Sequence, residues 1–147
     1  MSYLAATLIL QAAFLTSAPN TSAPSTSSLK YRDAYAEAQD SKRPLMIVLG
    51  ADWCQACVDL KQSTIPEMQK LGKLDGVVLT FVNIDEEPEL ARQLLGGPSI
   101  PQVILFSKGE SGSWVRKQLT GRQSSDSLAS LIAPTVTVAK TPATSTK

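Results

Sequence analysis

Short apolar segments constrain the fold of this chain more than any other feature. Residues 45–49 (LMIVL) are five consecutive apolar side chains, and residues 77–84 (VVLTFVNI) and 102–106 (QVILF) are almost as apolar. A strand with one face in water alternates apolar and polar residues, whereas a strand covered on both faces is apolar throughout. The three segments therefore predict strands of a largely buried sheet, of which the first is covered by helices on both faces.

Helical patterns lie around these predicted strands. The helix before the first strand places alanine and tyrosine side chains at helical spacing. Pro66 is expected to break or restart the helix after that strand, because proline lacks the amide hydrogen that a helix interior uses. Asp85 is expected to cap the next helix, which has Pro88 in its first turn. The expected helices are residues 29–40, 58–63, 88–95 and 124–132.

A half-exposed fourth strand completes the predicted sheet. Residues 114–119 alternate in polarity and follow the third strand after a short turn at residues 108–112. Two strands joined through a helix run parallel, and two strands joined by a short turn run antiparallel. The chain is therefore predicted to be an α/β protein of three layers, with a four-stranded mixed central sheet flanked by helices.

Composition excludes several classes of function. The chain has 147 residues, enough for one domain, with 14 Lys and Arg against 13 Asp and Glu. A net charge of +1 and 5% aromatic residues argue against a nucleic-acid partner, which would bind a basic surface or stack on aromatic rings. The absence of histidine excludes histidine-dependent hydrolase sites, and two cysteines cannot complete a tetrahedral metal site. Neither a cofactor nor a metal is expected.

The N-terminal region predicts export. No charged residue occurs before Lys30, and residues 3–16 form an apolar stretch of signal-peptide length. This stretch is shorter than the roughly 20 residues of a transmembrane helix. We expect a periplasmic or secreted protein, although no Lys or Arg precedes the stretch. A buried N-terminal helix and an uncleaved membrane tether are the alternatives.

The domain boundaries follow from composition. The segments on either side of the predicted domain consist mainly of Ser, Thr, Ala and Pro and bury too little apolar surface to order their backbone. The expected organisation is a signal peptide or apolar N-terminal segment at 1–17, a disordered linker at 18–28, a folded domain at 29–133 and a disordered tail at 134–147.

Both cysteines fall within one four-residue window directly after the first predicted strand. Cys54 would lie at the start of a helix, where free amide groups and the helix dipole favour the thiolate that reacts in disulfide exchange. Asp52 opposes this slightly, because a nearby negative charge disfavours a thiolate. The spacing brings Cys57 within bonding reach of Cys54. An inert structural disulfide is the alternative, but so short a closed loop adds little stability.

The cysteine window resembles the active-site segment of the thioredoxin superfamily. Residues 51–57 (ADWCQAC) follow an apolar strand, and residues 83–85 (NID) end the second strand as they do in that family. Residues 100–101 (Ile-Pro) precede the third strand and match the second signature of the family, the cis-proline loop. The similarity covers about residues 40–133 and implies a thioredoxin-like fold.

The resemblance implies a role for five residues. Cys54 would attack a substrate disulfide, and Cys57 would resolve the mixed disulfide. Trp53 would shield the cysteine pair. Pro101 would be cis and lie against the pair, while the backbone of Ile100 would pair with an extended substrate segment. These five are the predicted catalytic and substrate-binding residues.

The chain departs from the family pattern in two ways. Between the cysteines stand Gln55 and Ala56, and this context is similar to the reducing periplasmic domain of thiol-disulfide interchange proteins. Val48 occupies the position where many thioredoxins have a buried aspartate, and Phe81 aligns with the lysine usually near it. The usual proton acceptor for the resolving thiol is therefore missing, and water or a substrate group would take that proton.

Two functions fit these observations. The first is a monomeric thiol-disulfide oxidoreductase that uses Cys54 and Cys57, acts as a reductase rather than an oxidase, and has disulfide-containing substrate proteins and an upstream electron-donor protein as partners. The second is a non-catalytic thioredoxin-like binding module, or a chaperone that holds Cu(I) through the two cysteines.

Overall fold

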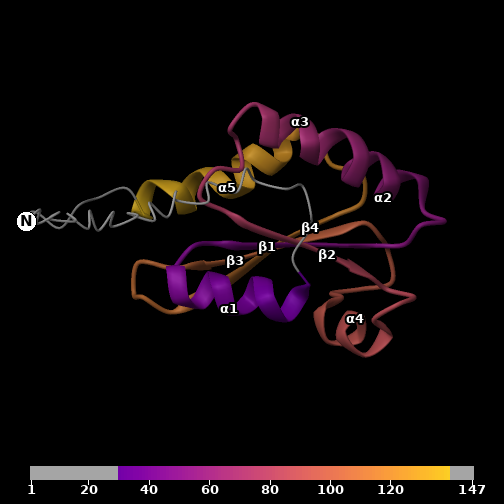
Figure 1. Cartoon of the computed structure of the whole chain (residues 1–147), viewed down its shortest axis with the longest axis horizontal. Coiled ribbons are helices and arrows are strands. Elements are labelled where there is room, and N and C mark those ends of the chain that lie inside the picture. Colours follow the sequence, from indigo (N-terminus) through magenta and orange to yellow (C-terminus); the bar gives the residue numbers. More distant parts are fainter. Residues whose placement is uncertain (1–29, 140–147) are drawn as a thin grey trace, which may run out of the picture.

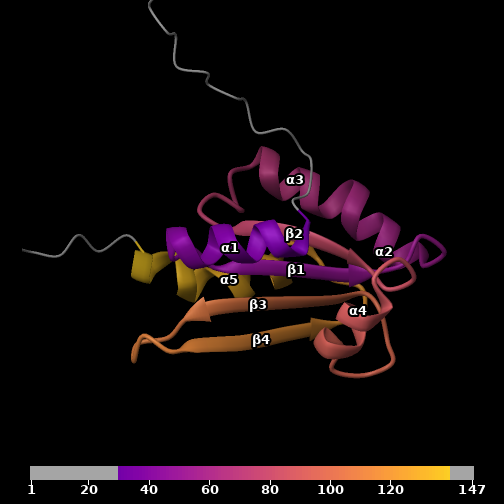
Figure 2. The same ribbon diagram turned by 60° about the horizontal axis from the view of Figure 1, so that its bottom comes forward.

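The four strands form one mixed sheet, seen edge-on in Figure 1, and their order β2-β1-β3-β4 can be followed in Figure 2. The computed structural model describes residues 30–139. Strand β1 pairs with β2 in parallel and with β3 antiparallel, and β3 pairs antiparallel with β4. The strands are β1 (Leu45–Gly50), β2 (Val78–Asn83), β3 (Gln102–Lys108) and β4 (Trp114–Thr120). This topology confirms the predicted mixed sheet and the predicted strand directions.

Helices cover both faces of this sheet, which confirms the three layers. One face carries α1 and α4, and the other carries the helices after β1 together with α5 (Figures 1 and 2). The helices are α1 (Tyr31–Ser41), α2 (Gln55–Asp59), the π-helical segment η1 (Leu60–Thr64), α3 (Ile65–Lys70), α4 (Pro88–Leu94) and α5 (Ser125–Ala139). No helix of the described part of the chain is long and apolar enough to cross a membrane.

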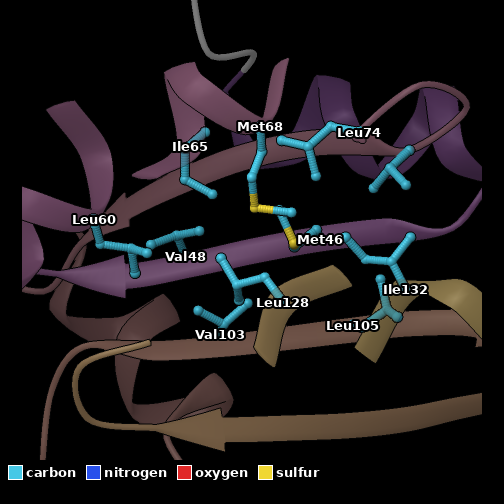
Figure 3. Close-up of a cluster of buried hydrophobic side chains, with 11 residues drawn as sticks. Met46, Val48, Leu60, Ile65, Met68, Leu74, Val103, Leu105, Leu128 and Ile132 are labelled. Atoms are coloured by element: carbon cyan, nitrogen blue, oxygen red, sulfur yellow. The ribbon is translucent and has the colours of Figure 1, made fainter. Parts of the chain in front are cut away.

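Strand β1 contributes side chains to two hydrophobic cores, one on each face of the sheet. Met46 and Val48 point to the face covered by α3 and α5, where they pack with Met68 and Leu128 (Figure 3). The alternate residues of β1 point to the opposite face and pack with Ala34 and Ala38 of α1. Because successive side chains of a strand point to opposite faces, a strand between two helical layers has no position left for a polar residue.

Pro66 does not break the helix after β1, contrary to the sequence-based expectation. Segments α2, η1 and α3 are consecutive and run from Gln55 to Lys70. Before the proline the helix widens, and the amide of Ile65 donates to the carbonyl of Leu60, five residues earlier. A π-helical turn changes the hydrogen-bond register, which accommodates the missing amide hydrogen without ending the helix.

Asp85 does not cap α4, contrary to the prediction. The residue before the helix is Glu87, and its side chain makes no capping bond. Asp85 lies too early for the capping position, and its carboxylate accepts a hydrogen bond from the indole of Trp53 instead.

The last helix extends further than the sequence indicates. The prediction ended it at 132 and placed a disordered tail from Pro134, but α5 continues through Pro134 to Ala139. Thr135 is buried, and its hydroxyl donates to the carbonyl of Ile132 at 2.6 Å. Helix therefore continues past the proline, although proline removes one backbone hydrogen bond. Residues 134–139 therefore belong to α5, while the predicted segments 1–17 and 18–28 lie outside the described residues.

Candidate active site

Four chain segments meet at one end of the sheet. Strand register places Gly50 opposite Asn83, Leu49 opposite Gln102, and Gln102 opposite Thr120. The same end of the sheet therefore carries four loops, those after β1, β2 and β4 and the one before β3. The cysteine pair and the Ile-Pro pair, 43 or more residues apart in sequence, come from two of these loops.

Cys54 begins the helix that leaves β1. Its backbone is extended (φ −90°, ψ 102°), and its sulfur accepts a hydrogen bond from the amide of Cys57 at 3.3 Å. The two cysteines form a disulfide with their Cα atoms 5.2 Å apart. Since helix continues to Lys70, the positive end of a long helix dipole faces the sulfur of Cys54. This arrangement favours negative charge on that sulfur once the disulfide is reduced.

The two sulfur-bearing residues differ in accessibility. Cys57 is buried, whereas Cys54 is partly exposed. Gly50 explains how Cys57 comes so close to β1, because a Cβ atom at Gly50 would lie 2.8 Å from the Cβ of Cys57. This role of Gly50 was not predicted, and its only signal in the sequence is a glycine at the end of an apolar strand. The first cysteine is thus the one that an external disulfide reaches.

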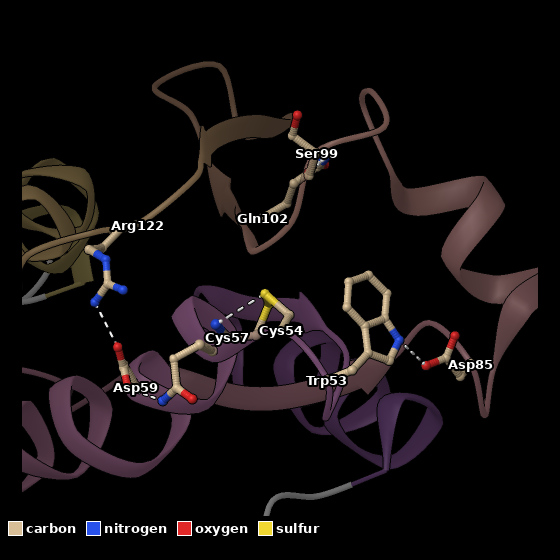
Figure 4. Close-up of a disulfide and its surroundings, with 9 residues drawn as sticks. Trp53, Cys54, Cys57, Asp59, Asp85, Ser99, Gln102 and Arg122 are labelled. Atoms are coloured by element: carbon tan, nitrogen blue, oxygen red, sulfur yellow. Dashed lines mark hydrogen bonds and ion pairs between the residues drawn. A yellow bond between two sulfur atoms is a disulfide. The ribbon is translucent and has the colours of Figure 1, made fainter.

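Trp53 lies on the solvent side of the cysteine pair. Its side chain is 70% exposed, and its indole nitrogen donates to the Asp85 carboxylate at 2.8 Å (Figure 4). Asn83 contacts both aspartates, since its amide nitrogen donates to the Asp52 carboxylate at 3.3 Å and its oxygen accepts from the backbone amide of Asp85 at 3.0 Å. Trp53 is therefore a surface residue held by the loop after β2, and no part of the hydrophobic core.

The loop before β3 contains a cis peptide bond between Ile100 and Pro101. Pro101 is buried, and its carbonyl accepts a hydrogen bond from Gly121 at 2.8 Å. Gly121 has a positive φ of 84°, a conformation that favours glycine. The loop after β4 is thereby joined to the proline loop.

Gln102 holds the proline loop from inside the protein, a role that sequence analysis missed. Its side chain is fully buried at the start of β3. The amide nitrogen donates to the carbonyls of Gly97 at 3.0 Å and Ser99 at 2.8 Å. The amide oxygen accepts from the backbone of Gly96 at 3.0 Å and from the side chain of Gln118 at 2.8 Å. A glutamine at the start of an otherwise apolar strand was the available signal.

A second contact near the cysteine pair is an ion pair between α2 and the loop after β4. Arg122, in the loop after β4, donates to the Asp59 carboxylate of α2 at 2.7 Å, and Gln55 donates to the same carboxylate at 2.8 Å (Figure 4). The hydrogen bonds from Gln55 and then Arg122 lower the pKa of Asp59 below its usual value. Sequence analysis did not single out this pair. It joins the cysteine-bearing helix to the loop after β4.

Comparison with known proteins decides the family. A family model described as thioredoxin-like matches residues 26–108, more than half of the chain. The chain belongs to the thioredoxin-like family. No curated protein matches the sequence of this thioredoxin-like chain.

Solved thioredoxins share the fold of this thioredoxin-like chain. One from Thermus thermophilus has a TM-score of 0.55 at 24% identity, over 78% of this chain and 89% of that one. A mutant thioredoxin from Halobacterium salinarum has a TM-score of 0.52 at 24% identity, over 67% and 80% of the two chains. A Fasciola hepatica thioredoxin has a TM-score of 0.54 at 19% identity, over 71% and 92%. At these identities the likeness concerns the fold.

The thioredoxin-like fold and the Cys54–Cys57 pair together support a thiol-disulfide oxidoreductase in general. The structure brings the predicted residues Trp53, Cys54, Cys57, Ile100 and Pro101 to one end of the sheet, while their individual roles stay predictions. No group of three or more His, Cys, Asp or Glu residues within 30–139 is arranged to hold a metal ion.

Proposed function

We propose that this chain reduces disulfide bonds of substrate proteins. The observation that carries the proposal is the asymmetry of the cysteine pair. Cys54 is partly exposed at the N-terminus of a long helix, and Cys57 is buried behind it. An exposed sulfur whose thiolate is stabilised suits attack on an external disulfide, and a buried neighbour suits intramolecular resolution.

The proposed reaction has two exchange steps. The Cys54 thiolate attacks one sulfur of a substrate disulfide, that disulfide breaks, and one substrate thiolate leaves. The Cys57 thiolate then attacks the sulfur of Cys54, the mixed disulfide breaks, and the second substrate thiolate leaves. Two electrons pass to the substrate, and the protein ends with the Cys54–Cys57 disulfide. An upstream donor protein returns the pair to the dithiol.

Charge near the site supports the reducing direction. Asp52 lies two residues before Cys54, and Asp59 lies on the same helix as the cysteines, with its charge partly offset by Arg122. Negative charge makes a nearby thiolate less stable. A less stable thiolate makes the dithiol a better electron donor, because oxidation removes that charge.

The substrate is proposed to bind between Trp53 and the proline loop. An extended substrate segment would pair with the backbone of Ile100 and lie against Pro101, with the substrate disulfide above Cys54. The protein is also proposed to act as a monomer outside the cytoplasm. The location rests on the apolar residues 3–16 and not on the described structure.

Insulin reduction with dithiothreitol as the electron source tests the proposal. Wild-type protein is expected to accelerate insulin precipitation, while Cys54→Ser abolishes this activity. Reduced Cys57→Ser, mixed with insulin after the dithiothreitol has been removed, is expected to accumulate a mixed disulfide at Cys54, visible by mass spectrometry. Ser63→Ala, an exposed serine on η1, is the control and should match wild type. An inert wild-type protein would favour the binding-module or Cu(I) alternative.

The equilibrium potential of the cysteine pair against glutathione tests the direction. A reductase should be mostly oxidised in a glutathione buffer that keeps a strong oxidant reduced. About 30 mV corresponds to a tenfold change in the equilibrium constant for two electrons. A pair that remains reduced in an oxidising glutathione buffer would assign the oxidase direction instead.

A further inference from the structure

A small cavity, partly open to solvent, lies beside the buried cysteine. It has a volume of about 40 Å³, and Cys57 is part of its wall. A water molecule needs roughly 10–15 Å³ of such space, so there is room for one beside the polar groups of the wall. The remaining wall comes from Val58 next to Cys57 in α2, from the ends of β1 and β2, from the loop after β1 and from η1. The cavity therefore joins Cys57 to residues of four neighbouring segments.

The reaction proposed above requires a base at this place. Cys57 is 6% exposed, and a thiol must lose its proton before it attacks a disulfide. Bulk water reaches a buried thiol poorly. The group that accepts the proton is therefore expected among the residues that line the cavity.

One carboxylate lines the cavity, and it belongs to Asp52. The amide of Asn83, also in the wall, donates to this carboxylate at 3.3 Å and fixes its position. Lys61 of η1 is the other charged residue of the wall, and its ammonium group lies 5.6 Å from the centre of the Phe81 ring. A cation at this place stabilises an anion that forms in the cavity.

The other residues of the wall carry no charge. Strand β1 contributes Val48, and β2 contributes Phe81 and Val82 beside the neutral amide of Asn83. Asp59 is engaged by Gln55 and Arg122 and does not line the cavity. Asp52 is thus the group of the wall that can accept a proton as a carboxylate.

We propose that Asp52 accepts the proton of Cys57, through the cavity, when the mixed disulfide is resolved. This inference rests on the exchange mechanism proposed above and identifies its base. The carboxylate of Asp52 takes the proton, and the Cys57 thiolate attacks the sulfur of Cys54. The bond from Cys54 to the substrate sulfur breaks, and that sulfur leaves as a thiolate. The proton on Asp52 then passes to the solvent or to the leaving thiolate.

The proposal separates two effects of the same charge. As a charge alone, Asp52 disfavours both cysteine thiolates, and its removal would make each exchange step equally fast or faster. As a proton acceptor, it accelerates resolution, and its removal slows that step alone. The sign of the change in the resolution rate therefore distinguishes the two roles.

Stopped-flow reaction of the reduced full-length protein with a small aromatic disulfide, 5,5′-dithiobis(2-nitrobenzoate), resolves the steps. Attack by Cys54 releases the first coloured thiolate, and attack by Cys57 releases the second. Asp52→Asn is expected to leave the first phase equal or faster and to slow the second about 100-fold at pH 7, the lower end of the range for general-base catalysis. The difference between the two proteins should shrink as the pH rises, because hydroxide increasingly takes the proton in place of the carboxylate.

Two variants accompany this measurement. Asp52→Glu keeps a carboxylate and should stay within about fivefold of wild type in the second phase, which a purely structural role of Asp52 does not predict. Glu86→Gln removes one negative charge from the exposed loop after β2, outside the cavity wall, and should leave the second phase unchanged.

The outcomes separate this inference from the proposed function. A second phase in Asp52→Asn that is as fast as in wild type from pH 6 to pH 9 overturns the role of Asp52. Equal slowing in Asp52→Glu and Asp52→Asn also overturns it. The aromatic disulfide reports resolution even if insulin is no substrate, so an inert insulin assay with a normal second phase overturns the substrate proposal alone.

Discussion

At the scale of single residues, the position of the buried cysteine depends on a glycine. Gly50 ends β1 and faces Cys57, and a Cβ atom there would lie 3.0 Å from the Cys57 sulfur and 2.8 Å from its Cβ. Carbon atoms in folded proteins do not approach so closely without a shift of backbone or side chain. The close contact of strand and helix thus requires the smallest residue at position 50.

The substitution Gly50→Ala should lower the free energy of unfolding of the oxidised protein by about 1–3 kcal/mol, because the added methyl group overpacks the contact with Cys57. Denaturant unfolding followed by circular dichroism measures this loss. Gly97→Ala is the matched control, since an added Cβ at Gly97 meets no atom within 4 Å and should change the free energy by less than about 0.5 kcal/mol. Equal effects of the two substitutions would contradict the steric explanation.

At the scale of elements, the proline loop is shaped by a buried amide more than by its own residues. Gln102 makes two donor and two accepting hydrogen bonds with residues 96–99 and with Gln118. A buried amide with every group bonded fixes one loop conformation, because any other leaves polar groups unpaired. The loop that ends in Ile100 and Pro101 is therefore held by the first residue of β3.

Replacing this amide should destabilise the protein and loosen the loop. Gln102→Ala is expected to lower the free energy of unfolding by about 2–4 kcal/mol, because it leaves the backbone groups of Gly96, Gly97 and Ser99 without their partner. Gln69→Ala, at an exposed position on α3, is the control with an expected change below about 0.5 kcal/mol. Denaturant titration measures both, and a small loss in Gln102→Ala would mean that the loop is held by other contacts.

The ion pair between α2 and the loop after β4 should make stability depend on pH. Hydrogen bonds from Gln55 and Arg122 lower the pKa of Asp59 in the folded protein below its usual value of 3.8. A lowered pKa stabilises the folded state at every pH above the usual value, and the contribution disappears as the pH falls through the lowered pKa.

Wild type should therefore have a higher Tm than Asp59→Asn at pH 6, and the difference should shrink progressively as the pH falls below the usual value of 3.8. The difference should be modest, since the pair is open to solvent. Thermal unfolding followed by circular dichroism measures it, and 1 M salt should reduce it at pH 6. A difference that persists undiminished in acid would mean that Asp59 stabilises the helix without its charge.

At the scale of the whole molecule, stability should decrease from the centre of the sheet towards one edge. Strand β1 pairs on both sides, and Leu45–Leu49 are at most 3% exposed. Strand β4 pairs with β3 alone, and most of its residues are exposed or half-buried. Local opening of a native protein is least costly where few buried contacts are broken.

Amide hydrogen exchange of the oxidised protein at pH 7 tests this gradient. Amides of β1 that bond to neighbouring strands should exchange only through global unfolding, whereas those of β4 that bond to β3 should exchange at least tenfold faster by local opening. Denaturant dependence of the rates distinguishes the two routes. Equal protection of β1 and β4 would mean that the sheet opens only as one unit.

Much of the fold could be predicted from the sequence. The apolar run 45–49, the alternating run 114–119 and the helices between them set strand directions and layers, because burial imposes a local periodicity on the residues. At two prolines, however, the helix ends predicted from the sequence were wrong. Pro66 and Pro134 predict helix ends from local chemistry, yet helix continues through both. A π-helical turn precedes Pro66, and the buried Thr135 follows Pro134.

The sequence by itself determined the strands, their directions and the location of the cysteine pair at the start of a helix, since each depends on residues close together in the chain. Only the tertiary structure decided which distant residues surround that pair. The contact of Gly50 with Cys57, the amide network of Gln102 and the cavity shared by Asp52 and Cys57 depend on strand register and close packing. These long-range relations leave no periodic pattern in the sequence, and they arise only when the chain is folded.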